Sequence, residues 1–144
     1  MNCVICDKHA NEEDVLYDGQ DWLITKGSYD ANILGYLCLA PRRHVEDWSD
    51  LTIDETKQIG VLIKTIELAI KQIIDIDRLY TVTISEAVRH LHFHLIPRKK
   101  DDSIRGLPLI QQATQQNLNF FKNISEQDYK KFEVEFKRIF AKTQ

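Results

Sequence analysis

The sequence has no long hydrophobic run and no large excess of charge of one sign. No stretch approaches the ~18 consecutive apolar residues that a membrane-spanning helix needs, and residues 1–20 contain no apolar segment of signal-peptide length. The formal net charge is −3, so no overall field draws the protein to nucleic acid or to anionic lipid. We therefore expect a cytoplasmic protein that binds neither nucleic acid nor a membrane.

Proline is also scarce, which argues against disorder. Only three of the 144 residues are proline, while 43% are apolar and 9% are aromatic, so the chain can bury a hydrophobic core. The length is close to the one at which a single core is commonest. Because no linker rich in proline, glycine or serine divides the chain, the sequence predicts one domain over residues 1–144.

Cysteine is rare as well, since the chain has three, which cannot all pair with one another. Two of them, Cys3 and Cys6, form a Cys-x-x-Cys motif near the N-terminus. In a reducing compartment this spacing favours a metal site over a structural disulfide. A redox-active dithiol and a pair of unliganded cysteines are the alternatives.

The pattern of apolar residues predicts an α+β domain with a mostly antiparallel sheet. A capping-box pattern at Thr52 and Glu55 begins one long amphipathic helix that runs to about residue 75. A second helix begins after Ser125, and we interpret its apolar stripe as a docking face: Tyr129, Phe132, Phe136, Ile139 and Phe140. Strands are expected at residues 15–18, 22–25, 35–40, 80–84 and 90–96.

Three of the five histidines alternate with apolar residues in the last of these strands. Side chains alternate between the faces of a strand, so His90, His92 and His94 share one face, and neighbouring histidines are about 6–7 Å apart at the backbone. Imidazole titrates near neutral pH, so such a patch can supply a nucleophile, a proton donor and a metal ligand. A solvated polar face or a simple metal site is the alternative. Pro97 is expected to end the strand.

His90-x-His92-x-His94-x-x, followed by Pro97-Arg98, resembles the signature of the histidine-triad (HIT) superfamily. Residues 35–46, which precede the long helix, resemble the middle section of that superfamily. With Cys3-x-x-Cys6 at the start, the chain is similar to its zinc-containing bacterial branch and to diadenosine polyphosphate hydrolases. The resemblance implies a HIT-like fold with a triad-containing core at about residues 3–100, and a C-terminal extension and helix over residues 101–144.

The resemblance also implies a nucleotide hydrolase that works through a covalent nucleotidyl-histidine intermediate. His92 would attack the α-phosphorus, and His94 would support the nucleophile and the phosphate pocket. The implied substrates are dinucleoside polyphosphates, such as diadenosine tetraphosphate, or nucleoside phosphoramidates. Transfer of the nucleotidyl group to phosphate or a sugar phosphate is one alternative, and a non-catalytic zinc-binding or nucleotide-binding module is another.

In the zinc-containing branch, the metal ligands correspond to Cys3, Cys6, His44 and His90 of this chain, and the implied zinc is structural. His9 is interpreted as a surface residue that could substitute as a ligand. The superfamily further implies a homodimer, formed through the long helix and a sheet edge. Burial within one chain explains the apolar face of that helix equally well.

The chain departs from the family pattern just before the triad. Many relatives carry Gly-Gln-Ser or Gly-Gln-Thr there, whereas this chain has Ser85-Glu86-Ala87. Ser85 can still donate a hydrogen bond to the substrate, but a carboxylate at Glu86 is unfavourable beside a phosphate unless it points away or is screened. The common Gly-His before the middle strand is Gly35-Tyr36 here.

Three arginines remain as candidates for phosphate contacts. Arg98 is a candidate substrate-binding residue, and Arg42 and Arg43 are candidates too. A charged strand end is the alternative for each of them. No role is predicted for residues 103–123.

Overall fold

Five strands form one antiparallel sheet in the computed structural model, which describes residues 2–117 and 119–143. The spatial order is β1-β2-β3-β5-β4, and every neighbouring pair is antiparallel. The predicted α+β class and antiparallel sheet are therefore confirmed. The strands are β1 (Val15–Asp18), β2 (Trp22–Lys26), β3 (Leu37–Pro41), β4 (Ile76–Val82) and β5 (Phe93–Lys99).

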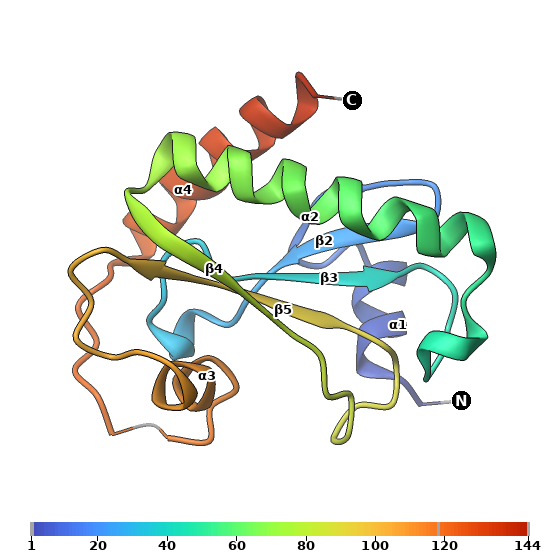
Figure 1. Cartoon of the computed structure of the whole chain (residues 1–144), viewed down its shortest axis with the longest axis horizontal. Helices are drawn as coiled ribbons and strands as arrows, with labels where there is room; N and C mark the ends of the chain where they lie inside the picture. The colour runs from blue at the N-terminus through green and yellow to red at the C-terminus, as the bar shows by residue number, and fades with distance from the viewer. Residues whose placement is uncertain (1, 118, 144) are drawn as a thin grey trace.

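Two helices lie on each side of this sheet. Figure 1 shows α2 and α4 above the sheet, and α1 and α3 below it. None of the helices in the described part of the chain is long and apolar enough to cross a membrane. The helices are α1 (Val4–Ala10), α2 (Ile53–Ile73), α3 (Leu107–Ala113) and α4 (Glu126–Ala141), with short 3-10 turns at Tyr29–Ala31 and Trp48–Asp50.

The capping box predicted at Thr52 is present, and a second one begins the helix after Ser125. The hydroxyl of Thr52 accepts the Glu55 N–H at 3.1 Å, and the Glu55 carboxylate accepts the Thr52 N–H at 2.7 Å. Ser125 and Asp128 make the same reciprocal pair at the start of α4. Each box satisfies backbone N–H groups that have no partner within the helix, so α2 and α4 begin where the sequence predicts.

The main core lies between the sheet and the upper pair of helices. Leu91, Phe93 and Leu95 point into it, as the alternation predicted. The side chains of the apolar stripe on α4 are all buried, which confirms that the stripe is a docking face: Tyr129, Phe132, Phe136, Ile139 and Phe140.

A smaller core lies under the opposite face of the sheet. Here Leu109 and Ala113 of α3 pack with Tyr36 and Ile96. The Gln112 amide also donates a hydrogen bond to the carbonyl oxygen of Ala31 at 3.0 Å. Part of the segment at residues 103–123, which had no predicted role, thus packs on its own chain.

The predicted strand at residues 90–96 is displaced in the structure. β5 begins at Phe93 and runs through Pro97 to Lys99. Leu91 donates its N–H to the Val45 carbonyl at 2.7 Å, so the chain before Phe93 follows the turn beyond β3 instead of the sheet. Pro97 does not end β5, because β3 pairs with β5 only as far as Leu95 and the missing N–H of proline is not needed beyond it.

Candidate functional site

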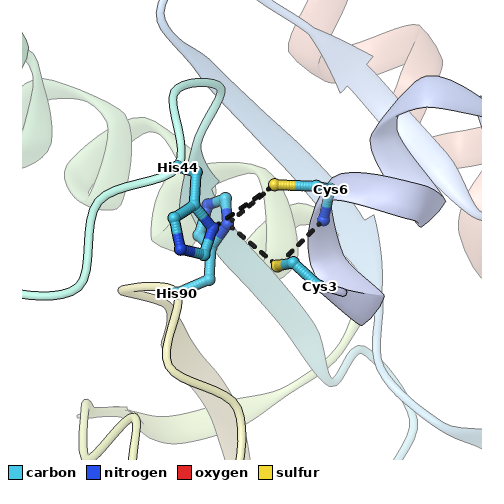
Figure 2. A group of neighbouring side chains, drawn as sticks. All are labelled: Cys3, Cys6, His44 and His90. Carbon is cyan, nitrogen blue, oxygen red and sulfur yellow. Dashed lines mark hydrogen bonds between the residues drawn. The ribbon is translucent and has the colours of Figure 1, made fainter. Parts of the chain in front are cut away.

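Two cysteines and two histidines from distant parts of the chain meet below the sheet. Figure 2 shows the thiols of Cys3 and Cys6, at the start of α1, beside the imidazoles of His44 and His90. His90 Nδ1 lies 3.4 Å from each sulfur, and His44 Nδ1 lies 3.5 Å from the sulfur of Cys6. The four ligand atoms all lie within 4.8 Å of one another. The set implied by the resemblance thus forms one cluster.

The spacing of this cluster fits a tetrahedral zinc ion. Zinc bonds of about 2.3 Å to sulfur and about 2.0 Å to nitrogen place tetrahedral ligands about 3.5 Å apart. The observed sulfur–nitrogen contacts of 3.4–3.5 Å match that separation. Two thiols with two imidazoles are also a common structural zinc set. A possible metal site therefore exists at these four residues.

The ring of His90 is held so that its Nδ1 faces the thiols. Its Nε2 lies 2.9 Å from the carbonyl oxygen of Pro41, and a carbonyl can only accept, so Nε2 carries the proton. Nδ1 is then left with a lone pair, as metal ligation requires. The imidazole is fully buried, and burial lowers the pKa of His90 below its usual value. Burial thus favours the neutral ring, and the hydrogen bond to Pro41 sets which nitrogen of that ring carries the proton.

His9 differs from its predicted position as a surface residue. The side chain is half-buried, and its ring packs edge-on against His90 with centroids 5.8 Å apart. Burial lowers the pKa of His9 to about 4. His9 is half-buried because the position of α1 turns this residue toward the cysteine–histidine cluster. His9 is not one of the four clustered ligands.

His92 lies immediately beyond this cluster, with its ring held by the backbone. Its Nδ1 is 2.6 Å from the carbonyl oxygen of His90, so the Nδ1–H donates and the Nε2 atom keeps a lone pair. Ser85 supports the same residue, because its hydroxyl accepts the His92 N–H at 3.2 Å. Among the described residues no protein group forms a hydrogen bond with His92 Nε2. This nitrogen is also not one of the buried side-chain atoms that lack a hydrogen-bond partner, so it is accessible. The lone pair of His92 Nε2 is thus available to a bound molecule.

His94, from β5, lies beside His92, with ring centroids 5.0 Å apart. Its Nδ1 is 2.6 Å from the hydroxyl oxygen of Tyr36, just before β3. Burial, together with the nearby His92, lowers the pKa of His94 to about 4. Sequence reasoning gave Tyr36 no role, although the unusual Gly35-Tyr36 pair marked this position.

Two adjoining pockets share the His92 and His94 rings. The first lies between the segment at residues 84–88 and the C-terminal end of α3, including Thr114 and Gln115. The second lies between α1 and residues 25–28. Ser85 lines the first pocket, beside both imidazoles. The structure therefore brings together His92, His94 and Ser85 of the predicted site.

Glu86 does not face the histidines as an isolated charge. Its side chain is 78% exposed and pairs with Arg89 at 3.3 Å. Arg89 also binds Glu46 at 3.2 Å. Glu86 lines the first pocket, but its carboxylate is largely exposed to solvent and is screened by Arg89.

The three candidate arginines lie outside this group. Arg98 is buried near the far end of β5, bonds to Asp77 and does not line either pocket. Arg42 bonds to Asp18, and Arg43 makes two bonds to the Glu55 carboxylate. All three arginines instead form ion pairs with acidic side chains of the protein. We leave Arg98 out of the proposed site.

No curated protein sequence matches the chain, but solved structures with the same fold do. A hypothetical histidine triad nucleotide-binding protein from Sulfolobus tokodaii is 18% identical, with 97% of this chain and 93% of that chain covered and a TM-score of 0.72. A zinc-bound histidine triad family protein from Mycobacterium smegmatis is 16% identical, with 99% and 96% covered and the same TM-score of 0.72.

A histidine triad protein from Bradyrhizobium japonicum is 22% identical, with 91% of this chain and 94% of that chain covered and a TM-score of 0.67. These likenesses show a common fold. The sequence model of the HIT domain matches residues 8–101, which include His44 and all three alternating histidines. The chain belongs to the HIT domain family.

Proposed function

We propose that this protein hydrolyses a nucleotide substrate by covalent catalysis at His92. The observation that carries the proposal is the hydrogen bond from His92 Nδ1–H to the His90 carbonyl, at 2.6 Å. This bond sets the tautomer in which Nε2 holds a lone pair, and it fixes the direction of that lone pair. Membership of the HIT family supports nucleotide hydrolase or transferase chemistry in general.

In the proposed first step, His92 Nε2 forms a bond to the α-phosphorus while the bond from phosphorus to the leaving group breaks. In the second step, water attacks the same phosphorus, the P–N bond breaks, and the nucleotide and the free imidazole are released. A ring fixed by its backbone suits this reaction, because phosphoryl transfer depends largely on positioning. Ser85 and His94 are the neighbouring groups that can contact the phosphate.

The charges around the two rings favour a substrate with few phosphates. Among the described residues that line the first pocket, none is Lys or Arg. The second pocket has Lys8 and Lys26, and both pair with Asp14, at 3.7 and 3.3 Å. A tetraphosphate bridge would bring several negative charges here without matching cations. We therefore propose a nucleoside phosphoramidate as the better substrate, rather than diadenosine tetraphosphate.

The experiment compares the wild type with His92→Ala on adenosine phosphoramidate and on diadenosine tetraphosphate. We expect the substitution to lower kcat/KM by at least about 1,000-fold, since it removes the nucleophile. Mass spectrometry of the quenched wild type should find an adenylyl group on His92. Circular dichroism and metal content should stay unchanged in the variant.

Turnover by His92→Ala at the wild-type rate would exclude the nucleophile, and turnover of neither substrate by the wild type would favour a non-catalytic module. A faster reaction with the tetraphosphate would contradict the charge argument. Added inorganic phosphate separates hydrolase from transferase, because only a transferase would pass the adenylyl group to it.

We propose in addition that Cys3, Cys6, His44 and His90 bind a structural zinc ion. When bound, zinc would hold four protein ligands with no open position, so it would supply stability and no catalytic water. The need for two reduced thiols suits a cytoplasmic location.

We also propose a homodimer in which β4 and α2 contact the partner. β4 lies at an edge of the sheet, so one side of the strand has no neighbour within the described chain. On α2, Val61 is 68% exposed and Leu68 is 53% exposed. Unpaired strand edges and exposed apolar side chains are both features of contact surfaces.

A further inference from the structure

We propose that Tyr36 is a positioning residue, whose hydroxyl fixes His94 in the tautomer that points an Nε2–H group toward the pocket beside His92. The effect on catalysis rests on the proposed function, whereas the tautomer itself does not. The two imidazoles would then be in opposite tautomers. His92 would present a lone pair and His94 a proton donor.

The contact between Tyr36 and His94 is short and enclosed. The hydroxyl oxygen lies 2.6 Å from His94 Nδ1, and the two rings stack with centroids 6.0 Å apart at an angle of 27°. Tyr36 is only 7% exposed. Little water reaches the bond, so it is stronger than the same bond in solvent.

The backbone of Gly27 holds the Tyr36 ring in this position. The Gly27 N–H donates to the Tyr36 carbonyl at 2.8 Å. A Cβ atom at Gly27 would lie 2.3 Å from the tyrosine ring, so the ring packs directly on this glycine. On its other side the ring belongs to the small core with Leu109 and Ala113 of α3. Packing on both sides of the ring thus holds the Tyr36 hydroxyl in place beside His94.

The direction of the bond follows from the proton content of its partners. Burial raises the pKa of Tyr36 above its usual value, so the phenol keeps its proton. The His94 ring is neutral at pH 7, because its pKa is lowered to about 4. Among the residues that the structure describes, Cys38 is the one other side chain that interacts with the hydroxyl, and sulfur is a weak acceptor. The phenol therefore donates to His94 Nδ1.

A neutral imidazole that accepts at Nδ1 carries its proton at Nε2. Among the described residues no protein group accepts a hydrogen bond from His94 Nε2. This nitrogen is also not one of the buried side-chain atoms that lack a hydrogen-bond partner. It therefore faces the pockets that His94 and His92 line together. An N–H donor there can bind a phosphate oxygen as the α-phosphorus is attacked, which stabilises the charge on that oxygen.

The test uses ring ¹⁵N chemical shifts in the full chain, selectively labelled at histidine. In the wild type, His94 Nδ1 should give the shift of an unprotonated acceptor and Nε2 that of a protonated nitrogen. Tyr36→Phe removes the donor, so the His94 shifts should move toward those of a mixture of both tautomers. Tyr129→Phe, which removes a buried hydroxyl bonded to the Tyr29 carbonyl, is the control and should leave the His94 shifts unchanged.

A double-mutant cycle on adenosine phosphoramidate separates positioning from general damage. Tyr36→Phe should lower kcat/KM by about 10-fold when His94 is present. In a His94→Ala background the same change should have almost no further effect. An equal loss in both backgrounds, or a wild-type His94 with its proton on Nδ1, would overturn the proposal. If the wild type turns over no nucleotide, the ¹⁵N shifts still decide the tautomer.

Discussion

The Glu55 carboxylate connects a helix start to the turn that carries a candidate metal ligand. It is 3% exposed and accepts the Thr52 N–H at 2.7 Å as well as two bonds from Arg43, at 3.0 and 2.8 Å. Arg43 directly precedes His44 in the chain. The hydrogen bonds from Arg43, more than any other interaction, lower the pKa of Glu55 to about 2.

This lowered pKa gives the folding stability a predictable pH dependence. The unfolded carboxyl has a pKa of about 4.3, so its contribution is complete above that value and is lost as the pH falls from about 4.3 through about 2. We expect Glu55→Gln to lower the free energy of unfolding by about 1–3 kcal/mol at pH 7.

The difference between Glu55→Gln and the wild type should shrink toward pH 2, as measured by urea unfolding across that range. Glu135→Gln is the control, because Glu135 pairs with Arg138 on the exposed face of α4. It should change the stability little at any pH. A Glu55→Gln loss that stayed constant from pH 7 to pH 2 would contradict the role of the charge.

Among the helices and strands, α1 is the one whose attachment to the fold depends most on side chains other than its own apolar ones. It has seven residues and none of them is buried, and an isolated helix of this length is unstable in water. Its N-terminal cap is Cys3, whose sulfur accepts the Cys6 N–H at 3.3 Å. The cysteine–histidine cluster therefore provides the main attachment of α1 to the sheet.

Loss of the metal should release α1 first. We expect protein purified without added zinc to contain about one zinc ion per chain, and Cys3→Ser to remove it. Hydrogen exchange of the backbone amides of α1 should then increase more than exchange in α2. Elemental analysis and hydrogen-exchange mass spectrometry measure these two effects.

Cys38→Ser is the matched control for this experiment, because Cys38 is a free cysteine outside the cluster. It should keep the zinc. Wild-type protein with well under one zinc per chain, and with a melting temperature that Cys3→Ser does not change, would exclude the structural metal.

At the scale of the whole molecule, the two edge strands of the sheet differ in length. β1 has four residues, whereas β4 has seven and is the longer template for another strand. Leu68 lies in the half of α2 that leads into β4. These features place the proposed dimer contact on one side of the molecule.

Light scattering should therefore give a mass of about twice the 16.9 kDa of one chain. Leu68→Asp places a charge in the proposed contact and should shift the mass toward the monomer. Val134→Asp, at a 66% exposed position on α4, should leave the dimer intact. A wild-type monomer at micromolar concentration would exclude the interface.

Local sequence patterns predicted the elements more accurately than the contacts between them. The capping boxes at Thr52 and Ser125 depend on residues three positions apart, so the starts of α2 and α4 were readable from the sequence. The start of β5 was not, because it depends on the bond between Leu91 and Val45. Likewise, the ion pair of Arg98 with Asp77 joins two strands, and no local pattern indicates it.

In the candidate site, the four metal-ligand positions were identified through the resemblance, and the structure brings all of them together. The partner of His94 was not identified. Tyr36 lies 58 positions away in the sequence, and a tyrosine before a strand is usually explained by packing alone. The sequence also did not indicate that the end of α3 lines the first pocket. Polar residues there, such as Thr114 and Gln115, form no periodic hydrophobic pattern.

The aromatic stripe of α4 has a consequence for the order in which the ribosome delivers the fold. Phe132, Phe136 and Phe140 fill the main core against α2, but they are synthesised after all five strands. Until residue 140 has left the exit tunnel, the nascent chain exposes the apolar surfaces that these rings later cover. During that interval the chain is a suitable client for chaperones that bind hydrophobic segments, although every residue of its proposed site has already been made.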